Sequence, residues 1–140
     1  MATFLDALIF NWLSAGTDGH AKKYSLLLGA RAQVRLAPLY ALGSALPYPD
    51  IDQRRLALAM KIGDTDRVHE VGAREFEQLA RELELDERQV LERAAELAAR
   101  TLELLPTTYE RERASGLEHP LMARLVERLR EHVARCQRAL

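Results

Sequence analysis

A short polar loop between two apolar segments carries the side chains whose types and spacing are best suited to chemistry. Residues 16–23 read Gly-Thr-Asp-Gly-His-Ala-Lys-Lys and combine one carboxylate (Asp18), one imidazole (His20) and two ammonium groups (Lys22 and Lys23). Charged groups in an apolar context cost free energy unless they have a purpose, and catalytic side chains are often carried on loops. The run therefore has the position of a catalytic loop, and the residues alone leave a structural role open. The structural alternative is that Asp18 caps a turn and His20 packs in the core.

Other polar groups lack the partners that a metal or hydrolase site needs. His69 stands beside Glu70 and His119 beside Glu118, but neither pair has a third ligand at a metal-binding spacing, so we expect all four on the surface. The serines outside the loop have no histidine and acid partnership. These serines are Ser14, Ser25 and Ser44.

Five arginines near the C-terminus raise the question of nucleic-acid binding. They are Arg124, Arg128, Arg130, Arg135 and Arg138. Glu127 and Glu131 are interleaved with them, and no aromatic side chains accompany them as a stacking platform. Interleaved charge is typical of a solvated helix face, so we expect no direct contact with nucleic acid.

The segments on either side of the loop must position it. Residues 3–15 carry apolar side chains at helical spacing on a wide face, which predicts a helix that ends at Gly16. Residues 24–28 and 33–36 are short apolar-rich runs around small residues, which predicts two strands joined by a turn near Gly29.

The chain changes character after this hairpin. Prolines make residues 37–50 irregular, and residues 56–62 form a candidate short strand. Beyond Gly72 the apolar residues recur at helical spacing in three stripes, which predicts three amphipathic helices. The stripes are Phe76, Leu79, Ala80 and Leu83; Val90, Leu91, Ala94, Leu97, Ala98, Thr101 and Leu105; and Leu121, Leu125, Val126, Leu129 and Val133.

Cap and breaker residues set the expected ends of these helices. Asp86, with Gln89 three residues later, predicts a capping box at the start of the second helix. Pro106 is expected to end that helix, and Pro120 suits the first turn of the third helix.

Length and composition limit the class of protein. The chain has 140 residues, which suits one domain (1–140), with 48% apolar and 29% charged residues and a net charge of -1. Residues 1–50 hold seven charged side chains and residues 73–140 hold 26, so we expect the first part to be mostly buried. The single cysteine, Cys136, excludes an internal disulfide. With no membrane-spanning stretch and no secretory signal in the sequence, we predict a cytoplasmic protein that makes no membrane contact.

The polar loop and its flanks resemble a known family. Phe-Asn-Trp-Leu-Ser-Ala-Gly-Thr-Asp-Gly-His-Ala-Lys at residues 10–22, followed by Tyr-Ser-Leu-Leu-Leu at 24–28 and Arg-Leu-Ala-Pro-Leu-Tyr at 35–40, resembles the C-terminal lobe of HipA-family serine/threonine kinases. The resemblance continues at residues 44–47 and 58–61 and is generic further on. The family's upstream part, including its N-terminal lobe, has no counterpart in this sequence.

The resemblance implies roles for several side chains. Asp18 matches the catalytic Asp of the family's Thr-Asp-Gly-His motif, and His20 and Lys22 match residues close to the nucleotide phosphates. Tyr40 matches an aromatic residue that lines the nucleotide site, and we include Lys23 among the candidate cofactor-binding residues. The resemblance further implies ATP and Mg as cofactors, a protein serine as substrate, toxin–antitoxin biology and a helix-turn-helix antitoxin as a partner.

The sequence departs from the family at both metal positions. Five residues after Asp18 the family has Asn where this chain has Lys23, and after the Pro-x-Tyr run it has Asp where this chain has Ala41. Magnesium requires oxygen ligands, so we predict no metal ligands and no cofactor bound by this chain alone. If Lys23 occupies the metal space, its ammonium pairs with Asp18 and lowers the pKa of that carboxylate.

The fold class we predict is α+β and mostly α-helical, part of a kinase-like C-terminal lobe with a small β-hairpin. It comprises a catalytic-loop-like half (1–62) and a helical half (73–140). The leading functional hypothesis is a HipA-like kinase domain that is catalytically impaired or incomplete. One alternative is a half-kinase activated by a separately encoded N-terminal lobe, and another is a non-enzymatic protein-interaction module.

The first helix bears on assembly. Only two residues precede it in this sequence, and in the family earlier helices cover it, so we expect Phe4, Leu8 and Trp12 to lie partly bare. Large exposed apolar patches usually mark an interface. This predicts a homodimer or a complex with a separate N-terminal-lobe protein. The alternative is that the C-terminal helices fold back over the first helix.

Overall fold

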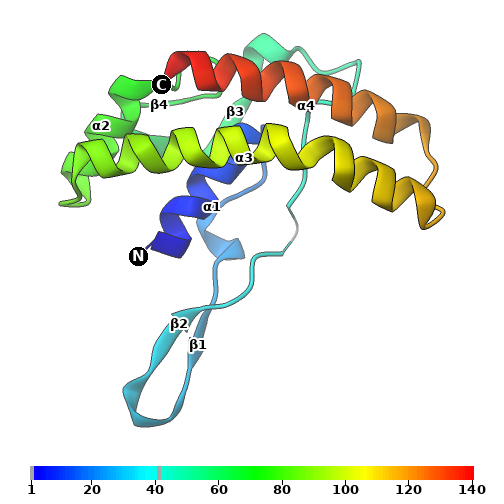
Figure 1. The fold of residues 1–140 in the computed structure, drawn as a ribbon. Helices are drawn as coiled ribbons and strands as arrows, with labels where there is room; N and C mark the ends of the chain where they lie inside the picture. The colour runs from blue at the N-terminus through cyan, green and yellow to red at the C-terminus, as the bar shows by residue number, and fades with distance from the viewer. Residues whose placement is uncertain (1, 41) are drawn as a thin grey trace.

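Four helices form the body of the molecule, seen here in a computed structural model that describes residues 2–40 and 42–140 (Figure 1). They are α1 (Ala2–Leu13), α2 (Ala73–Glu82), α3 (Glu87–Ala114) and α4 (Pro120–Ala139). Helices α3 and α4 run side by side, and α1 packs against both. The described part of the chain therefore has the predicted α+β, mostly helical class.

Helix α1 is the centre of the core. Its apolar side chains cover a wide face, and Ile9, Trp12 and Leu13 are fully buried. The Trp12 ring meets Phe76 of α2 edge to face, with 5.1 Å between the ring centroids. The Trp12 Nε1–H donates to the Val68 carbonyl at 3.2 Å. Burial of one such side chain contributes about 1.5–3 kcal/mol, so α1 anchors the fold.

The expectation of a bare first helix is wrong for two of its three residues. Leu8 and Trp12 are buried, because α3 and α4 fold over α1. Phe4 is partly buried, and its ring lies 5.0 Å from that of Tyr24. The described surface of α1 therefore gives no support to a homodimer through these three side chains.

Two small antiparallel hairpins complete the described fold. Strands β1 (Leu26–Leu28) and β2 (Val34–Leu36) pair with Leu26 opposite Leu36. Strands β3 (Ala57–Ile62) and β4 (Thr65–Arg67) form the second hairpin, which packs near α1 and α2. Three 3-10 turns lie between these elements: η1 (Ala21–Lys23), η2 (Ala30–Ala32) and η3 (Gln53–Arg55).

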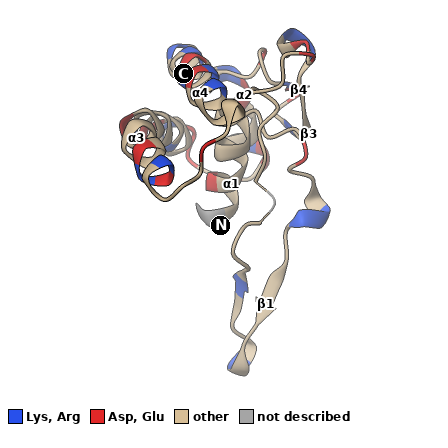
Figure 2. Cartoon of the chain, turned by 90° about the vertical axis from the view of Figure 1, so that its right-hand side faces the viewer, with Lys and Arg blue, Asp and Glu red and all other residues tan. Residues whose placement is uncertain are grey.

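Residues 24–40, which we name the arm, project away from the helices (Figures 1 and 2). The β1–β2 hairpin forms most of it, as predicted, but its apolar side chains are not buried. Leu26 is 63% exposed and Leu28 is 79% exposed. The expectation that residues 1–50 are mostly buried therefore holds for α1 and is wrong for the arm. The low number of charged residues did not indicate burial there, because no helix or second sheet of the described residues covers the two strands.

Helix α3 corrects a second expectation. It continues through Pro106 to Ala114 instead of ending at the proline. A proline inside a helix removes one backbone hydrogen bond and costs about 3 kcal/mol. Contacts between α3 and α4 stabilise the pair of helices. The helix therefore bends away near its C-terminal end without breaking (Figure 1).

The helix ends otherwise follow the sequence closely. The Asp86 side chain accepts a hydrogen bond from the Gln89 backbone N–H at 2.8 Å, which is the forward half of the predicted capping box. Pro120 begins α4, as expected. Helix α1 ends at Leu13, and Ala15 rather than Gly16 takes the left-handed conformation, with φ of 49°. Within the described residues, no helix is both long enough and apolar enough to cross a bilayer.

Candidate functional site

The loop that follows α1 is held against a buried amide. Asn11 is buried in α1, and its Nδ2 donates to the Tyr24 hydroxyl at 3.1 Å. A Cβ added at Gly16 would lie 2.8 Å from the Asn11 Oδ1, and one at Gly19 would overlap the same amide. Glycine is therefore required at both positions by close approach, and Asn11 fixes where the loop leaves the helix.

Asp18 and Lys23 form the central contact of the loop. The Lys23 Nζ donates to the Asp18 Oδ2, and the His20 Nε2 lies 3.6 Å from the Asp18 Oδ1. The hydrogen bond and the charge of Lys23 hold the pKa of the Asp18 carboxyl below its usual value, with a smaller contribution from His20. The expected pair between Lys23 and Asp18 is therefore present.

The pair is asymmetric in its exposure. The Asp18 side chain is 73% exposed, whereas that of Lys23 is 20% exposed. The apolar stem of Lys23 is covered while its ammonium reaches the carboxylate. His20 is 42% exposed, so the alternative that it packs in the core is not what the structure shows. The loop presents the carboxylate to solvent with a cation already attached to it.

The remaining candidate residues are not drawn into this contact. Lys22 is exposed on η1, and Tyr40 is exposed at the end of the arm. Ala41 lies outside the described residues. The structure thus brings Asp18, His20 and Lys23 together, and it shows no contact that joins Lys22 or Tyr40 to them.

The loop does not fit a magnesium ion. Magnesium takes oxygen ligands in near-octahedral geometry, and the Asp18 carboxylate already accepts from an ammonium group. Among residues 2–40 and 42–140, no three His, Cys, Asp or Glu side chains are grouped to hold a metal ion. The cavity beside the loop, which Asn11, Gly16 and Gly19 line in part, measures about 10 Å³. That is room for about one water molecule.

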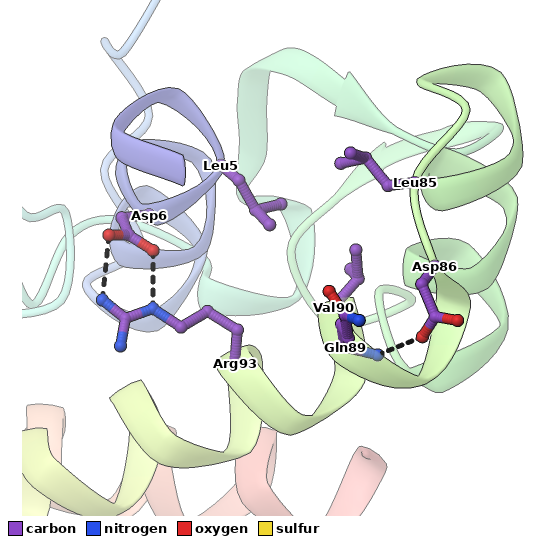
Figure 3. Close-up of a pocket in the computed structure, with 7 residues that line it drawn as sticks. All are labelled: Leu5, Asp6, Leu85, Asp86, Gln89, Val90 and Arg93. Atoms are coloured by element: carbon purple, nitrogen blue, oxygen red, sulfur yellow. Dashed lines mark hydrogen bonds and ion pairs between the residues drawn. The ribbon is translucent and has the colours of Figure 1, made fainter. Parts of the chain in front are cut away.

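A separate pocket of about 300 Å³ lies between α1 and the start of α3 (Figure 3). Across it, Arg93 donates from Nε to the Asp6 Oδ1 at 2.8 Å and from Nη2 to the Asp6 Oδ2 at 2.9 Å. Glu96 accepts a third hydrogen bond from the same guanidinium at 2.7 Å. The bonds to Asp6 and Glu96 raise the pKa of Arg93 above its usual value. The pocket is thus crossed by a bidentate ion pair that ties α1 to α3.

The other polar candidates have structural roles or lie on the surface. The His69 Nε2 is 3.8 Å from the Glu70 Oε1 in an exposed pair. The His119 Nδ1 accepts from the Leu121 N–H at 3.2 Å and caps α4. Arg128 pairs with Glu131 at 3.1 Å. The contacts of His69, His119 and Arg128 agree with the expected surface positions. Arg135 was expected on the same solvated face but is partly buried and donates to the His69 and Val68 carbonyls.

Asn11 and Tyr24 are the residues that the sequence interpretation left without a role. Neither has a charge, and neither stands in the polar run. The available signal was an amide among the apolar residues of a helix whose face is otherwise buried. A buried amide has to find a hydrogen-bond partner, and the spacing alone did not identify Tyr24 as that partner.

Comparison with solved structures places this geometry in a known fold. A chain of the Shewanella oneidensis MR-1 complex of HipA, HipB and its operator DNA matches with a TM-score of 0.74 and 24% sequence identity. The match covers 96% of this chain and 30% of that chain. At this identity the likeness defines the fold: the C-terminal part of a HipA-like architecture.

Sequence comparison then gives the family. The model of the HipA-like C-terminal domain matches residues 1–105, so the chain belongs to this family. Two proteins of Sinorhizobium fredii (strain NBRC 101917 / NGR234) are similar. The one named "Putative kinase Y4mE" is 35% identical over 106 residues, which are 71% of this chain and 24% of that protein. The one named "Putative kinase Y4dM" is 27% identical over 132 residues, which are 94% of this chain and 30% of that protein. The chain thus spans less than a third of the length of these relatives.

Proposed function

We propose that this chain is the catalytic-loop part of a HipA-like serine/threonine kinase fold and that it does not transfer phosphate by itself. The observation that carries the proposal is the Lys23 ammonium bound to the Asp18 carboxylate. In kinases the corresponding Asp accepts or orients the substrate hydroxyl. A carboxylate that is paired with an ammonium, and whose pKa is lowered, is a weaker base.

The metal chemistry points the same way. Phosphoryl transfer by kinases depends on metal ions that neutralise charge on the phosphates. Lys23 supplies a positive charge where the family resemblance implies an oxygen ligand, and a fixed cation opposes a second cation nearby. Impairment of this kind leaves the fold intact, since the pair is satisfied within the loop.

The test measures magnesium-dependent incorporation of labelled phosphate from ATP by the 140-residue chain. We expect none above background. The double variant Lys23→Asn with Ala41→Asp restores the two side chains that the family resemblance implies, and Lys22→Asn is the matched control for loss of one loop lysine. Incorporation by the unaltered chain that Asp18→Asn abolishes would overturn the proposal.

A second candidate function, a half-kinase or interaction module completed by another protein, has its own support in the arm. No Asp or Glu occurs in residues 19–49, and Arg31 and Arg35 give the arm positive charge beside its exposed leucines. Figure 2 shows basic and no acidic residues along the projecting hairpin. We propose that it docks on a protein surface that is apolar at its centre and acidic at its rim. A helix-turn-helix antitoxin is a candidate partner, since the similar Shewanella chain comes from a complex that contains HipB.

Charge and apolar variants of the arm test this docking. The chain is co-expressed with each protein encoded beside it, and the mass of the purified complex is measured by light scattering. We expect Leu28→Lys and Arg35→Glu to prevent the complex, while Leu104→Lys, an exposed leucine on α3, leaves it intact. A complex that survives both arm variants, or a homodimer that the arm variants do not affect, would contradict the proposed surface.

A further inference from the structure

A third cavity, of about 190 Å³, is lined by apolar side chains and by polar side chains that all contain nitrogen. It lies between η3, the segment after β4, and α4. Its polar lining side chains are Gln53, Arg54, His69, His132 and Arg135, and its apolar lining side chains are Leu46, Leu56 and Val68. Every polar lining side chain carries nitrogen donors, and none is a carboxylate. None of these residues belongs to the loop at 16–23.

The two arginines of this cavity lack the carboxylate partner that the other pocket provides. In the pocket between α1 and α3, Asp6 neutralises Arg93 through two hydrogen bonds. No ion pair joins Arg54 or Arg135 to an acidic side chain within the described residues. Two carboxylates near the cavity engage other groups: Glu70 lies 3.8 Å from the His69 Nε2 and accepts from Thr65 at 2.7 Å, and the Asp52 Oδ1 accepts from the Arg54 backbone N–H at 3.0 Å.

Arg135 is held in place by neutral groups. Its Nη1 donates to the His69 carbonyl at 3.2 Å, and its Nη2 donates to the Val68 carbonyl at 3.4 Å. The same Nη2 lies 3.3 Å from the His132 Nδ1, while the His132 Nε2 lies 2.9 Å from the Trp12 carbonyl. These contacts assign the imidazole proton to Nε2, so Nδ1 accepts from the guanidinium.

These contacts hold the Arg135 guanidinium in place without neutralising its positive charge. A guanidinium has five N–H donors, so the three contacts leave donors over for a ligand. Carbonyl and imidazole partners carry no net negative charge. The positive charge of Arg135 and that of Arg54 therefore remain available at the cavity, above an apolar floor.

We propose that this cavity binds a small oxyanion, a carboxylate or phosphate group, attached to a short apolar group. Guanidinium groups pair with both anions through charge-assisted hydrogen bonds. The leucine and valine floor suits a few carbon atoms, and the volume excludes a nucleotide-sized ligand. The inference does not depend on the proposed kinase-like function, because it uses none of the residues of that loop.

The test titrates the 140-residue chain with four probes and follows the backbone amides of Val68 and His69 by NMR. The probes are butyl phosphate, butyrate, inorganic phosphate and butylamine. We expect saturable shifts with the first two, weaker binding of inorganic phosphate, which lacks the apolar group, and none with butylamine. Stronger binding of butyl phosphate or of butyrate identifies which oxyanion the cavity prefers.

Adjacent arginines provide matched variants. Arg54 lines the cavity, and its side chain makes no hydrogen bond or ion pair within the described residues, whereas Arg55 is its neighbour on η3 and does not line the cavity. Arg54→Gln should weaken binding of butyl phosphate about tenfold, through loss of one charge-assisted contact. Arg55→Gln removes the same charge and should change binding by less than about twofold. Equal losses in the two variants, binding of butylamine as tight as that of butyl phosphate, or no saturation by any anion would overturn the inference.

Discussion

The arm and the helical body use their apolar side chains in opposite ways. In the body, Trp12, Phe76 and Ile9 are fully buried, and α1 is covered on several sides. In the arm, the leucines of β1 are exposed to solvent on a hairpin of three-residue strands. An isolated two-stranded hairpin is only marginally stable in water. The difference shows that the body contains its own source of stability, whereas the leucines of the arm gain little from burial within the described residues.

The largest expected effect on stability comes from truncating a buried side chain of the body, and an exposed side chain of the arm serves as the comparison. Trp12→Ala should lower the free energy of unfolding by about 3–5 kcal/mol, because it leaves a cavity beside Phe76 and removes the hydrogen bond to the Val68 carbonyl. Leu28→Ala in the arm should leave it unchanged within about 0.5 kcal/mol. Urea unfolding followed by far-UV circular dichroism measures both. A similar loss in the two variants would show that the arm belongs to the same cooperative unit as α1.

The same contrast explains which parts of the fold could be predicted from the sequence. Helix α1, the β1–β2 hairpin and the caps at Asp86 and Pro120 follow from local spacing and turn chemistry, whereas β3 was expected as a lone strand and its partner β4 was not predicted. Burial does not, because it depends on which segments meet. The apolar run at residues 26–28 was indistinguishable from a core strand, and Leu8 and Trp12 were expected bare although α3 and α4 cover them.

The candidate site divides along similar lines. The pair of Asp18 and Lys23 was expected only if Lys23 occupied the metal space that the family resemblance implies, and the structure contains this pair. The contact from Asn11 to Tyr24 spans two elements, and the spacing did not reveal it. The continuation of α3 past Pro106 was likewise not predicted from the local sequence.

The second prediction concerns pH and tests the body alone. Burial holds the pKa of His132 below its usual value, and the Arg135 charge adds to this, while the hydrogen bond to the Trp12 carbonyl opposes it. Cys136 also faces the ring, with its Sγ 3.5 Å from the Nε2, and burial raises its pKa to about 12, so it stays neutral. The unfolded chain therefore binds a proton at a pH where the folded chain does not.

The sign follows from this difference. The stabilising contribution is fully present above the unfolded pKa of about 6.5 and is lost as the pH falls below it. The slope is at most about 1.4 kcal/mol per pH unit. Urea midpoints between pH 7.5 and 5 measure the loss. His132→Gln should flatten this dependence, whereas His69→Gln, whose side chain is exposed, should preserve it. An unchanged slope in His132→Gln would assign the pH dependence to other groups.

The third prediction addresses the tie between α1 and α3. Asp6→Asn keeps the size of the side chain and removes the charge that Arg93 contacts at 2.8 and 2.9 Å. Both side chains are about one-third exposed, so solvent screens the pair and the expected loss is about 1 kcal/mol. The exposed pair of Arg88 and Glu92 is the comparison, and Arg88→Gln should have no measurable effect. Equal stability of the Asp6→Asn variant and the unaltered chain would show that α1 is held by its apolar face only.

The smallest effect on stability is expected from Lys23→Asn, which should instead change the pKa of Asp18 in the loop. Removal of the ammonium should raise the pKa of Asp18 toward its ordinary value, since the Lys23 hydrogen bond and charge are the two largest causes of its depression. A depressed carboxyl contributes stability above its unfolded pKa that is lost as the pH falls through its folded pKa. Any loss of stability in Lys23→Asn is therefore expected at pH values above about 4 and should disappear on acidification. NMR titration of the Asp18 carboxyl carbon measures the pKa directly, with Lys22→Asn as the control that removes a loop lysine without this contact. If the pKa of Asp18 is the same in both variants, Lys23 points into solvent, and the proposed reason for an inactive loop would then rest on position 41 alone.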